Sequence, residues 1–319
     1  KKPEAVAALL KIVATADVLI DGLRPGVTER MGVGPDVCHA INPRLIYGRM
    51  TGWGQTGPWS QMAGHDINYI GMTGVLNAIG KDGQPPVPPL NMIGDFGGGS
   101  MFLVNGILAA IIERAQTGRG NIVDAAIVDG THSLMSFVHG MAGVGQWRAK
   151  REANLLDGAA PFYRCYMTAD GKFMAVGCIE PQFFAAMMER LPIDREAYGA
   201  QHDHAAFAKQ HEMLEDVFAT KTRDAWEAIF AGTDACVTPV LDYVEAASHP
   251  VNAERHAVVT DGRWLHPQVA PRLATQPLPT HFDIATKGAD YAAILAEAGL
   301  GTDEISQLIA AGAVVANKD

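Results

Sequence analysis

The hydrophobic positions in the first part of the chain alternate between helical spacing and short apolar runs. Residues 4–16 have the spacing of an amphipathic helix, and the apolar run DVLI follows at 17–20. A second helix is expected at about 35–41, before the apolar run LIYGRM at 45–50. Short buried strands that alternate with helices are typical of a parallel sheet with crossover helices. The pattern therefore predicts an α/β domain.

The next segments continue this alternation. The glycine- and proline-rich loop TGWGQTGPWSQMAG precedes a helix that starts near His65. Residues 84–90 are expected to be extended, because proline fixes φ and removes a backbone donor. The segment GDFGGGS at 94–100 opens an apolar helix that reaches about residue 116, and a third strand is predicted at 121–129. The predicted sheet thus has three strands.

The pattern changes near residue 155. Alternating residues on both sides of the turn ADGK predict a β-hairpin. Helices at about 182–191, 203–219 and 223–231 and a strand at 236–241 follow. This β-then-α order predicts a smaller α+β domain.

These patterns divide the chain into two domains and two linkers. The large domain is expected to comprise 1–128 and 275–319, with two short helices in its tail. The small α+β domain is expected at 155–250. Residues 129–154 and 251–274 are interpreted as linkers, the second because it contains prolines and little periodicity.

Composition and charge exclude several classes of function. The 319 residues are 48% hydrophobic and 19% charged, so a sizeable core can form and disorder is not expected. The formal net charge is −10 and no block of Lys and Arg occurs, so nucleic acid is not expected as a partner. The longest apolar run, 101–112, is too short to span a bilayer, and no membrane partner is expected.

Cysteine and histidine spacing indicates neither disulfides nor a metal site. The four cysteines form no CxxC pair: Cys38, Cys165, Cys178 and Cys236. Free thiols in a long chain indicate a reducing compartment, and a cytoplasmic location is expected. The pair His202/His204 lies in a polar, helix-like stretch and is interpreted as a solvated face, so no metal is expected.

Two segments of the large domain carry candidate acid–base residues. His65 stands at a predicted helix start, which favours a neutral imidazole able to accept a proton, with a hydrogen-bonded structural histidine as the alternative. Asp95 precedes three glycines at another helix start, with an N-cap aspartate as the alternative. Each glycine destabilises a helix by roughly 0.5–1 kcal/mol. The run therefore favours close approach of a ligand to backbone amides, which could also stabilise an oxyanion.

Further polar residues follow the predicted strands. Arg24 and Arg30 come after the first strand, where ligands of open α/β sheets bind, and are candidate phosphate ligands, with solvated arginines as the alternative. Glu180 falls between a strand and a helix, with an exposed first-turn carboxylate as the alternative. His132 and His139 are expected on one helix in a core or interface role.

Six segments occur in the order typical of one family: DGLRPGVTERMG, RMTGWGQTGP, GHDINY, PPLNMIGDFGGGS, IVDAAIVDG and IEPQF. Together they resemble the α-methylacyl-CoA racemase branch of the family III CoA-transferase superfamily. The resemblance runs from the first helix to about residue 245 and also fits the tail. It implies an interlocked homodimer, whose active site lies between the Rossmann-like large domain of one subunit and the small domain of its partner. It also implies that an opening strand and loop of the large domain precede Lys1.

The resemblance gives roles to individual residues. His65 and Asp95 correspond to two catalytic bases, and Glu180 to the carboxylate that pairs with His65. CoA contacts are implied for Gly22, Leu23, Arg24, Arg30, Gly64, His65, Asp66, Ile67, Asn68 and Tyr69. The implied substrate is an acyl-CoA thioester, and no cofactor is expected because CoA is part of the substrate.

The implied reaction interconverts (R)- and (S)-2-methylacyl-CoA by 1,1-proton transfer. One base removes the α-proton and the other protonates the opposite face of an enolate, whose oxygen the Asp95 backbone amide would stabilise. One alternative is a CoA-transferase of the same superfamily that uses Asp95 as nucleophile. His65 favours the racemase, because the resemblance indicates that such transferases lack a histidine in that loop. The other alternative is an inactive acyl-CoA-binding fragment.

Overall fold

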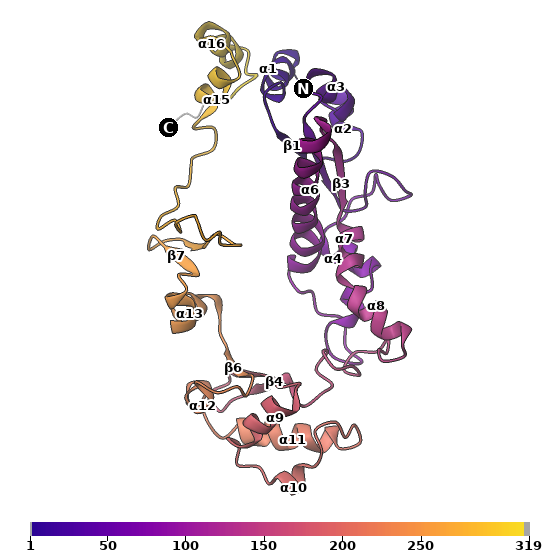
Figure 1. Ribbon diagram of the computed structural model, residues 1–319, viewed down its shortest axis with the longest axis vertical. Coiled ribbons are helices and arrows are strands. Elements are labelled where there is room, and N and C mark those ends of the chain that lie inside the picture. The colour runs from indigo at the N-terminus through magenta and orange to yellow at the C-terminus, as the bar shows by residue number, and fades with distance from the viewer. Residues whose placement is uncertain (1, 316–319) are drawn as a thin grey trace. The chain divides into compact units, whose positions relative to one another are not determined.

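The computed structural model describes residues 2–315, which form two compact units (Figure 1). The first unit contains the residues up to Arg151 and those from Thr286 onward, and the second runs from Glu152 to Ala285. The chain therefore leaves the first unit, builds the whole second unit and then returns.

A three-stranded parallel sheet forms the centre of the first unit. Its order is β1 (Val18–Asp21), β2 (Ile46–Thr51), β3 (Ile122–Ala126), with Leu19 opposite Tyr47 and Tyr47 opposite Ile122. The central strand β2 is buried from Ile46 to Arg49, which explains why its sequence is an apolar run rather than an alternation. The predicted α/β content and parallel sheet are confirmed.

Helices cover both faces of this sheet. Ile46 packs with Leu103 and Ile107 of α6 (Met101–Thr117), whereas its neighbour Tyr47 packs with residues of α1 and α3. Successive side chains of a strand point to opposite faces, so β2 contributes to both layers. The helices on the Tyr47 side are α1 (Pro3–Val13) and α3 (Pro35–Ile41). The loops contain the short helices α2 (Val27–Met31), α4 (Asp66–Met72) and α5 (Val75–Ala78).

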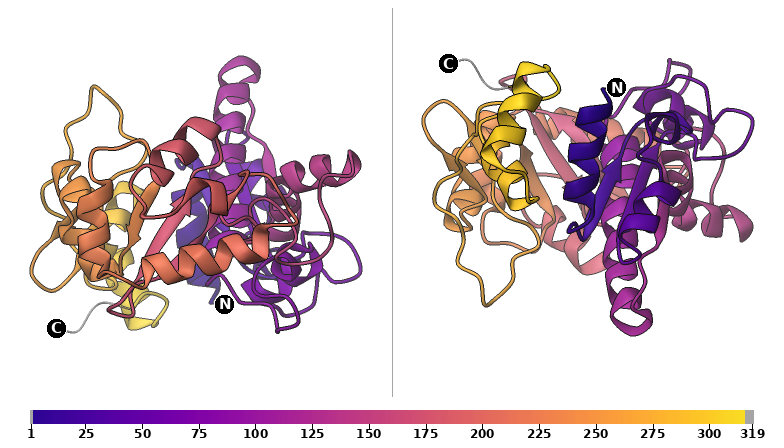
Figure 2. Two further views of the ribbon diagram at one scale, coloured as in Figure 1. Left: turned by 90° about the horizontal axis from the view of Figure 1, so that it is seen from below. Right: turned by 90° about the horizontal axis from the view of Figure 1, so that it is seen from above.

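The end of the chain completes the same unit. Two helices, α15 (Tyr291–Glu297) and α16 (Thr302–Ala310), lie beside α1 (Figure 2, right view). Ala8 of α1 is buried together with Leu295, Leu300 and Leu308. Two helices were predicted in the tail, and this cluster attaches them to the large unit.

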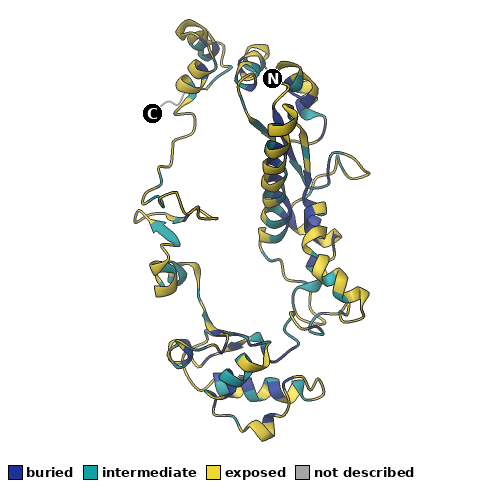
Figure 3. Ribbon diagram, in the orientation of Figure 1, coloured by how far each residue is buried: buried dark blue, intermediate teal, exposed yellow. Residues whose placement is uncertain are grey.

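A continuous helical stretch runs from Met92 to Thr117. It begins as a π-helix, η1 (Met92–Ser100), and continues as α6. Its 26 residues are long and apolar enough to cross a membrane by length and composition alone, which is weak evidence for a span because helices of protein cores meet the same criterion. Only 22% of its most apolar part is buried, and much of α6 is exposed (Figure 3).

The glycine run of η1 packs against another helix. A Cβ atom on Gly98 would lie 2.4 Å from Thr131 Oγ1, and one on Gly130 would lie 1.9 Å from the Gly98 carbonyl oxygen. Thr131 and Gly130 belong to α7 (Ile127–Leu134), so η1 and α7 meet backbone to backbone. The interpretation of these glycines as a site of ligand approach is therefore wrong: they permit helix–helix contact.

Two further predictions are corrected in this region. The predicted strand at 121–129 ends at Ala126, and the remaining residues open α7. His132 and His139 do not share a helix, because α7 stops before Met135 and His139 lies in α8 (Ser136–Gly143). Their ring centroids are 6.1 Å apart. Part of the stretch interpreted as a linker, 129–154, is thus helical.

The second unit is built on a three-stranded antiparallel sheet. The hairpin β4 (Tyr163–Met167) and β5 (Phe173–Gly177) pairs through β5 with β6 (Val237–Val240). One core cluster, with Tyr166, Met174 and Trp226 among its fully buried side chains, joins the sheet to its helices. These helices are α9 (Pro181–Met188), α10 (Arg195–Tyr198), α11 (Phe207–Phe218) and α12 (Arg223–Phe230).

The return segment is more ordered than its sequence predicts. It contains α13 (Tyr243–Ser248), α14 (Pro250–Glu254) and an antiparallel pair of short strands, β7 (Val258–Thr260) and β8 (Leu265–Pro267). Residues 251–274, interpreted as a linker, therefore include a helix and a two-stranded sheet of the second unit.

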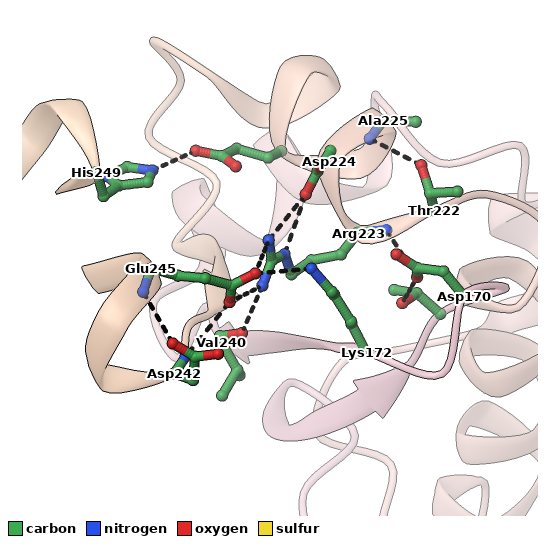
Figure 4. Close-up of polar contacts among 12 residues, drawn as sticks. Asp170, Lys172, Thr222, Arg223, Asp224, Ala225, Val240, Asp242, Glu245 and His249 are labelled. Carbon is green, nitrogen blue, oxygen red and sulfur yellow. Dashed lines mark hydrogen bonds and ion pairs between the residues drawn. The ribbon is translucent and has the colours of Figure 1, made fainter. Parts of the chain in front are cut away.

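An ion-pair network connects α12 to α13 (Figure 4). The nearly buried Arg223 guanidinium donates to both carboxylate oxygens of Glu245, at 2.6 and 3.1 Å, and Lys172 Nζ donates to Glu245 at 2.7 Å. These bonds, that from Arg223 first, lower the pKa of Glu245 to about 2. The carboxylate therefore stays ionised and holds α13 at the edge of the sheet.

Candidate functional site

The loop after β1 is fixed by a buried aspartate. Asp21 is only 4% exposed, and its carboxylate accepts hydrogen bonds from the Leu23 amide (2.8 Å) and the Thr28 hydroxyl (3.0 Å). Arg49, which lies opposite Asp21 on β2, is 3.4 Å from it and donates to Glu29 at 2.7 Å. This pair was not predicted from the sequence, where its signal is an acid and a base near the ends of neighbouring apolar runs. The hydrogen bond from the Leu23 amide to Asp21 fixes the position of this loop.

A pocket of about 270 Å³ opens beside this loop. Six of its lining residues were predicted as CoA contacts: Gly22, Leu23, Arg24, Gly64, His65 and Tyr69. Others were not singled out from the sequence, namely Pro25, Thr51, Gly52, Trp53, Ser60, Met62 and Ala63. The loops that follow β1 and β2 thus meet at the carboxyl ends of the parallel strands, where ligands of such sheets bind.

Aromatic side chains form one wall of the pocket. The Trp53 ring meets Trp59 and Tyr69 edge to face, with centroids 4.9 Å apart in both pairs. Gly52 and Gly64 make room for the Tyr69 ring, since a Cβ atom on either would lie within 2.7 Å of it. Burial, and then the nearby Asp95 carboxylate, raise the pKa of Tyr69, so its phenol remains neutral. This wall is largely apolar, and its one hydroxyl, on Tyr69, donates to the Gly64 carbonyl oxygen.

His65 lies at the N-cap of α4 and on the pocket wall. Its backbone is extended, and its amide donates to Asn68 Oδ1 at 3.0 Å. His65 is exposed. The ring is therefore available to a ligand in the pocket.

Asp95 lies in the first turn of η1 and is half-buried. Its backbone amide donates to Asp66 Oδ2 at 2.7 Å, so the predicted use of this amide as an oxyanion donor is wrong. Asp66 itself is 5% exposed and begins α4 next to His65. Its predicted CoA contact stays a prediction. The hydrogen bond from the Asp95 amide to Asp66 brings the starts of α4 and η1 together.

The remaining predicted site residues have separate positions. Ile67 and Asn68 are exposed on α4, and Arg30 is exposed on α2, where its guanidinium lies over Gly26 and not in the pocket lining. Glu180 is exposed at the N-cap of α9 in the second unit. Its pairing with His65 stays a prediction.

No metal site is seen within residues 2–315, where no group of three or more His, Cys, Asp or Glu side chains could hold an ion. His202 and His204 are exposed and precede α11, so they are not on a helix as the sequence suggested.

Comparisons with known proteins give the chain a family. The model of CoA-transferase family III matches residues 1–287. The alpha-methylacyl-CoA racemase of Mus musculus is 44% identical over 310 residues, which cover 97% of this chain and 81% of that protein. That of Homo sapiens is 41% identical over 320 residues, covering 100% and 84%. The crystal structure of a CaiB/BaiF family protein from Brucella suis has a TM-score of 0.78 at 24% identity, covers 93% of this chain and 79% of its own, and shows the same fold.

Proposed function

Because the chain belongs to CoA-transferase family III, we propose that it is an α-methylacyl-CoA racemase that interconverts (R)- and (S)-2-methylacyl-CoA. The resemblance found in the sequence motifs is confirmed, and relatives at 44% and 41% identity support an isomerase of the racemase class. The observation that carries the proposal is the pocket at the strand ends with His65 on its wall and Asp95 attached to the neighbouring residue.

The two bases suit a proton transfer between opposite faces of a carbon. His65 and Asp95 come from the starts of two different helices, and their side chains differ in chemistry. In one direction the imidazole removes the α-proton while the carboxylic acid of Asp95 donates one, and the reverse direction exchanges these roles. Arg24, on the pocket wall of an acidic protein, would bind a phosphate of CoA.

The enolate oxygen needs a donor other than the Asp95 amide. The first amides of a helix lack acceptors within the helix, and α4 begins beside His65 on the pocket wall. We assign the stabilisation of the enolate to this turn, where one such donor is typically worth about 3–4 kcal/mol. No further cofactor is needed, since CoA is part of the substrate.

The proposal includes a homodimer with a shared site. Met101, Val104, Leu108 and Ile112 form an apolar row at helical spacing on α6, each about half exposed or more. A second copy that covers this row would also explain how Glu180, in the second unit, reaches His65 and stabilises its imidazolium form. The apolar row and the free thiols are consistent with a soluble dimer in the cytoplasm.

One experiment separates the racemase from a transferase. In deuterated water the racemase exchanges the α-proton of both enantiomers of a 2-methylacyl-CoA. His65→Gln and Asp95→Asn are expected to stop racemisation while leaving residual exchange of opposite enantiomers, because each variant keeps one base. A transferase would instead accumulate a hydroxylamine-sensitive adduct on Asp95 when only a donor thioester is present. That adduct in the absence of exchange would exclude the racemase.

A further inference from the structure

Asp66 is a buried carboxylate that the proposed reaction leaves unused. It is 5% exposed, and Oδ1 has no hydrogen-bond partner among the described residues. No Lys, Arg or His in the described part of the chain pairs with it. A buried carboxylate without a cation lowers stability, and Asn would fill the same volume without a charge. Stability alone therefore does not account for Asp66.

The one hydrogen bond that the Asp66 side chain makes within the described part of the chain explains its position. The first hydrogen bond of the π-helix runs from the Phe96 amide to the Asn91 carbonyl oxygen at 3.3 Å, so the Asp95 amide has no acceptor within η1. Asp66 Oδ2 provides that acceptor at 2.7 Å, across 29 residues of sequence. The bond is charge-assisted, which makes it stronger than a bond to a neutral acceptor.

A glycine keeps this contact open. A Cβ atom on Gly94 would lie 2.5 Å from Asp66 Oδ2 and 3.0 Å from Ile70 Cγ2. Any side chain at this position would push η1 away from α4. The backbone that precedes Asp95 is thus shaped around the Asp66 carboxylate.

We propose that Asp66 is a positioning residue that sets the Asp95 carboxylate relative to His65. His65 is its neighbour in the chain, and Asp95 is bound through its own amide, so a single side chain connects the backbones that carry both bases. The inference rests on the proposed racemase function. A displacement of about 1 Å at a reacting group can lower a rate by about 100-fold, so this connection affects the rate directly.

The test compares Asp66→Ala and Asp66→Asn with the wild-type protein. Asp66→Ala is expected to lower kcat for racemisation by about 10- to 100-fold with KM within about twofold, because Asp95 moves while the pocket remains. Asp66→Asn keeps a carbonyl oxygen but loses the charge-assisted bond, and it is expected to recover only part of the rate. In Asp66→Ala, exchange of the α-proton is expected to fall for the enantiomer whose proton Asp95 removes. It persists for the enantiomer whose proton His65 removes. Asp36→Ala, at the exposed first turn of another seven-residue helix, is the matched control.

A second measurement is independent of turnover. Hydrogen–deuterium exchange of the Asp95 amide is expected to accelerate by about tenfold or more in Asp66→Ala and not in Asp36→Ala. Equal loss of both exchange reactions in Asp66→Ala, or wild-type kinetics, would overturn the positioning role. Absence of α-proton exchange in the wild-type protein would instead overturn the proposed function, and the positioning role with it. Slow hydrogen–deuterium exchange of the Asp95 amide would in that case show only that its hydrogen bond to Asp66 is present.

Discussion

At the scale of single residues, the arginines predicted to bind phosphate differ in position. Arg24 lines the pocket, whereas Arg30 does not. Their sequence environment is the same strand-end loop, so spacing alone could not separate them. Side-chain direction depends on the local turn, which the buried Asp21 determines through its bond to the Leu23 amide.

This difference predicts unequal effects on substrate binding. Arg24→Ala is expected to raise KM for an acyl-CoA by about tenfold, because a charge-assisted hydrogen bond contributes about 1.5–3 kcal/mol at most sites. Arg30→Ala is expected to change KM by less than about twofold. Steady-state kinetics with competition by free CoA measures both. Equal effects of the two substitutions would remove the assignment of Arg24.

At the scale of elements, the contact between η1 and α7 depends on small residues. The sequence predicts the helix that begins near residue 94 but assigns the start of α7 to a strand. It does not predict the contact of the two helices, since the Cβ clash at Gly98 involves Thr131 of another helix. A run of glycines has the same sequence whether a ligand or a helix approaches it. The link between Asp66 and Asp95 was missed for the same reason, as its partners lie 29 residues apart. The strands of the parallel sheet, by contrast, were predictable from local apolar runs.

Gly98→Ala is expected to destabilise the first unit by about 1–3 kcal/mol, because the added methyl group has no space against α7. Gly140→Ala on α8 is the matched control, since nothing lies within 4 Å of its added Cβ. That variant is expected to be neutral or to raise stability by up to about 1 kcal/mol. Denaturant unfolding measures the two variants side by side, and equal midpoints would contradict the packing role.

The Arg223–Glu245 network predicts the acid sensitivity of the second unit. The pKa of Glu245 is about 2 in the folded protein and 4.5 for the free group. Its contribution to stability is therefore present above about pH 4.5 and is lost as the pH falls toward 2. Glu245→Gln is expected to be less stable than wild type at pH 7 and to show a flatter pH dependence between pH 5 and 2.

Thermal unfolding between pH 7 and pH 2 measures this effect. Glu212→Gln, an exposed glutamate on α11, is the control and is expected to follow the wild-type curve. A Glu245→Gln curve parallel to that of wild type would show that the network does not depend on this charge.

At the scale of the whole molecule, the proposed site draws on both units. His65 and Asp95 belong to the first, and Glu180 belongs to the second. The sequence predicted a large and a small domain, and the structure places the turn from one unit to the other at residue 151 and the return at 286. Sequence patterns placed the return earlier, because the short β7–β8 pair has too few residues to produce a clear alternation.

A shared site predicts complementation between inactive variants. Co-expression of His65→Ala and Glu180→Ala chains is expected to restore about a quarter of wild-type activity, since half of the dimers are mixed and one of their two sites is intact. Activity of isolated mixed dimers, purified with two affinity tags, measures this. Inactive mixed dimers would mean that His65, Asp95 and Glu180 of one site all come from the same subunit.

The cluster of Ala8 with Leu295, Leu300 and Leu308 has a consequence for biosynthesis. The ribosome releases the apolar face of α1 before it makes the second unit, yet the side chains of α15 and α16 that cover this face emerge only after that unit. The second unit is continuous in sequence and can fold while the chain is still being made. The first unit, although its α1 emerges before the second unit, reaches its final packing only after α15 and α16 have been made.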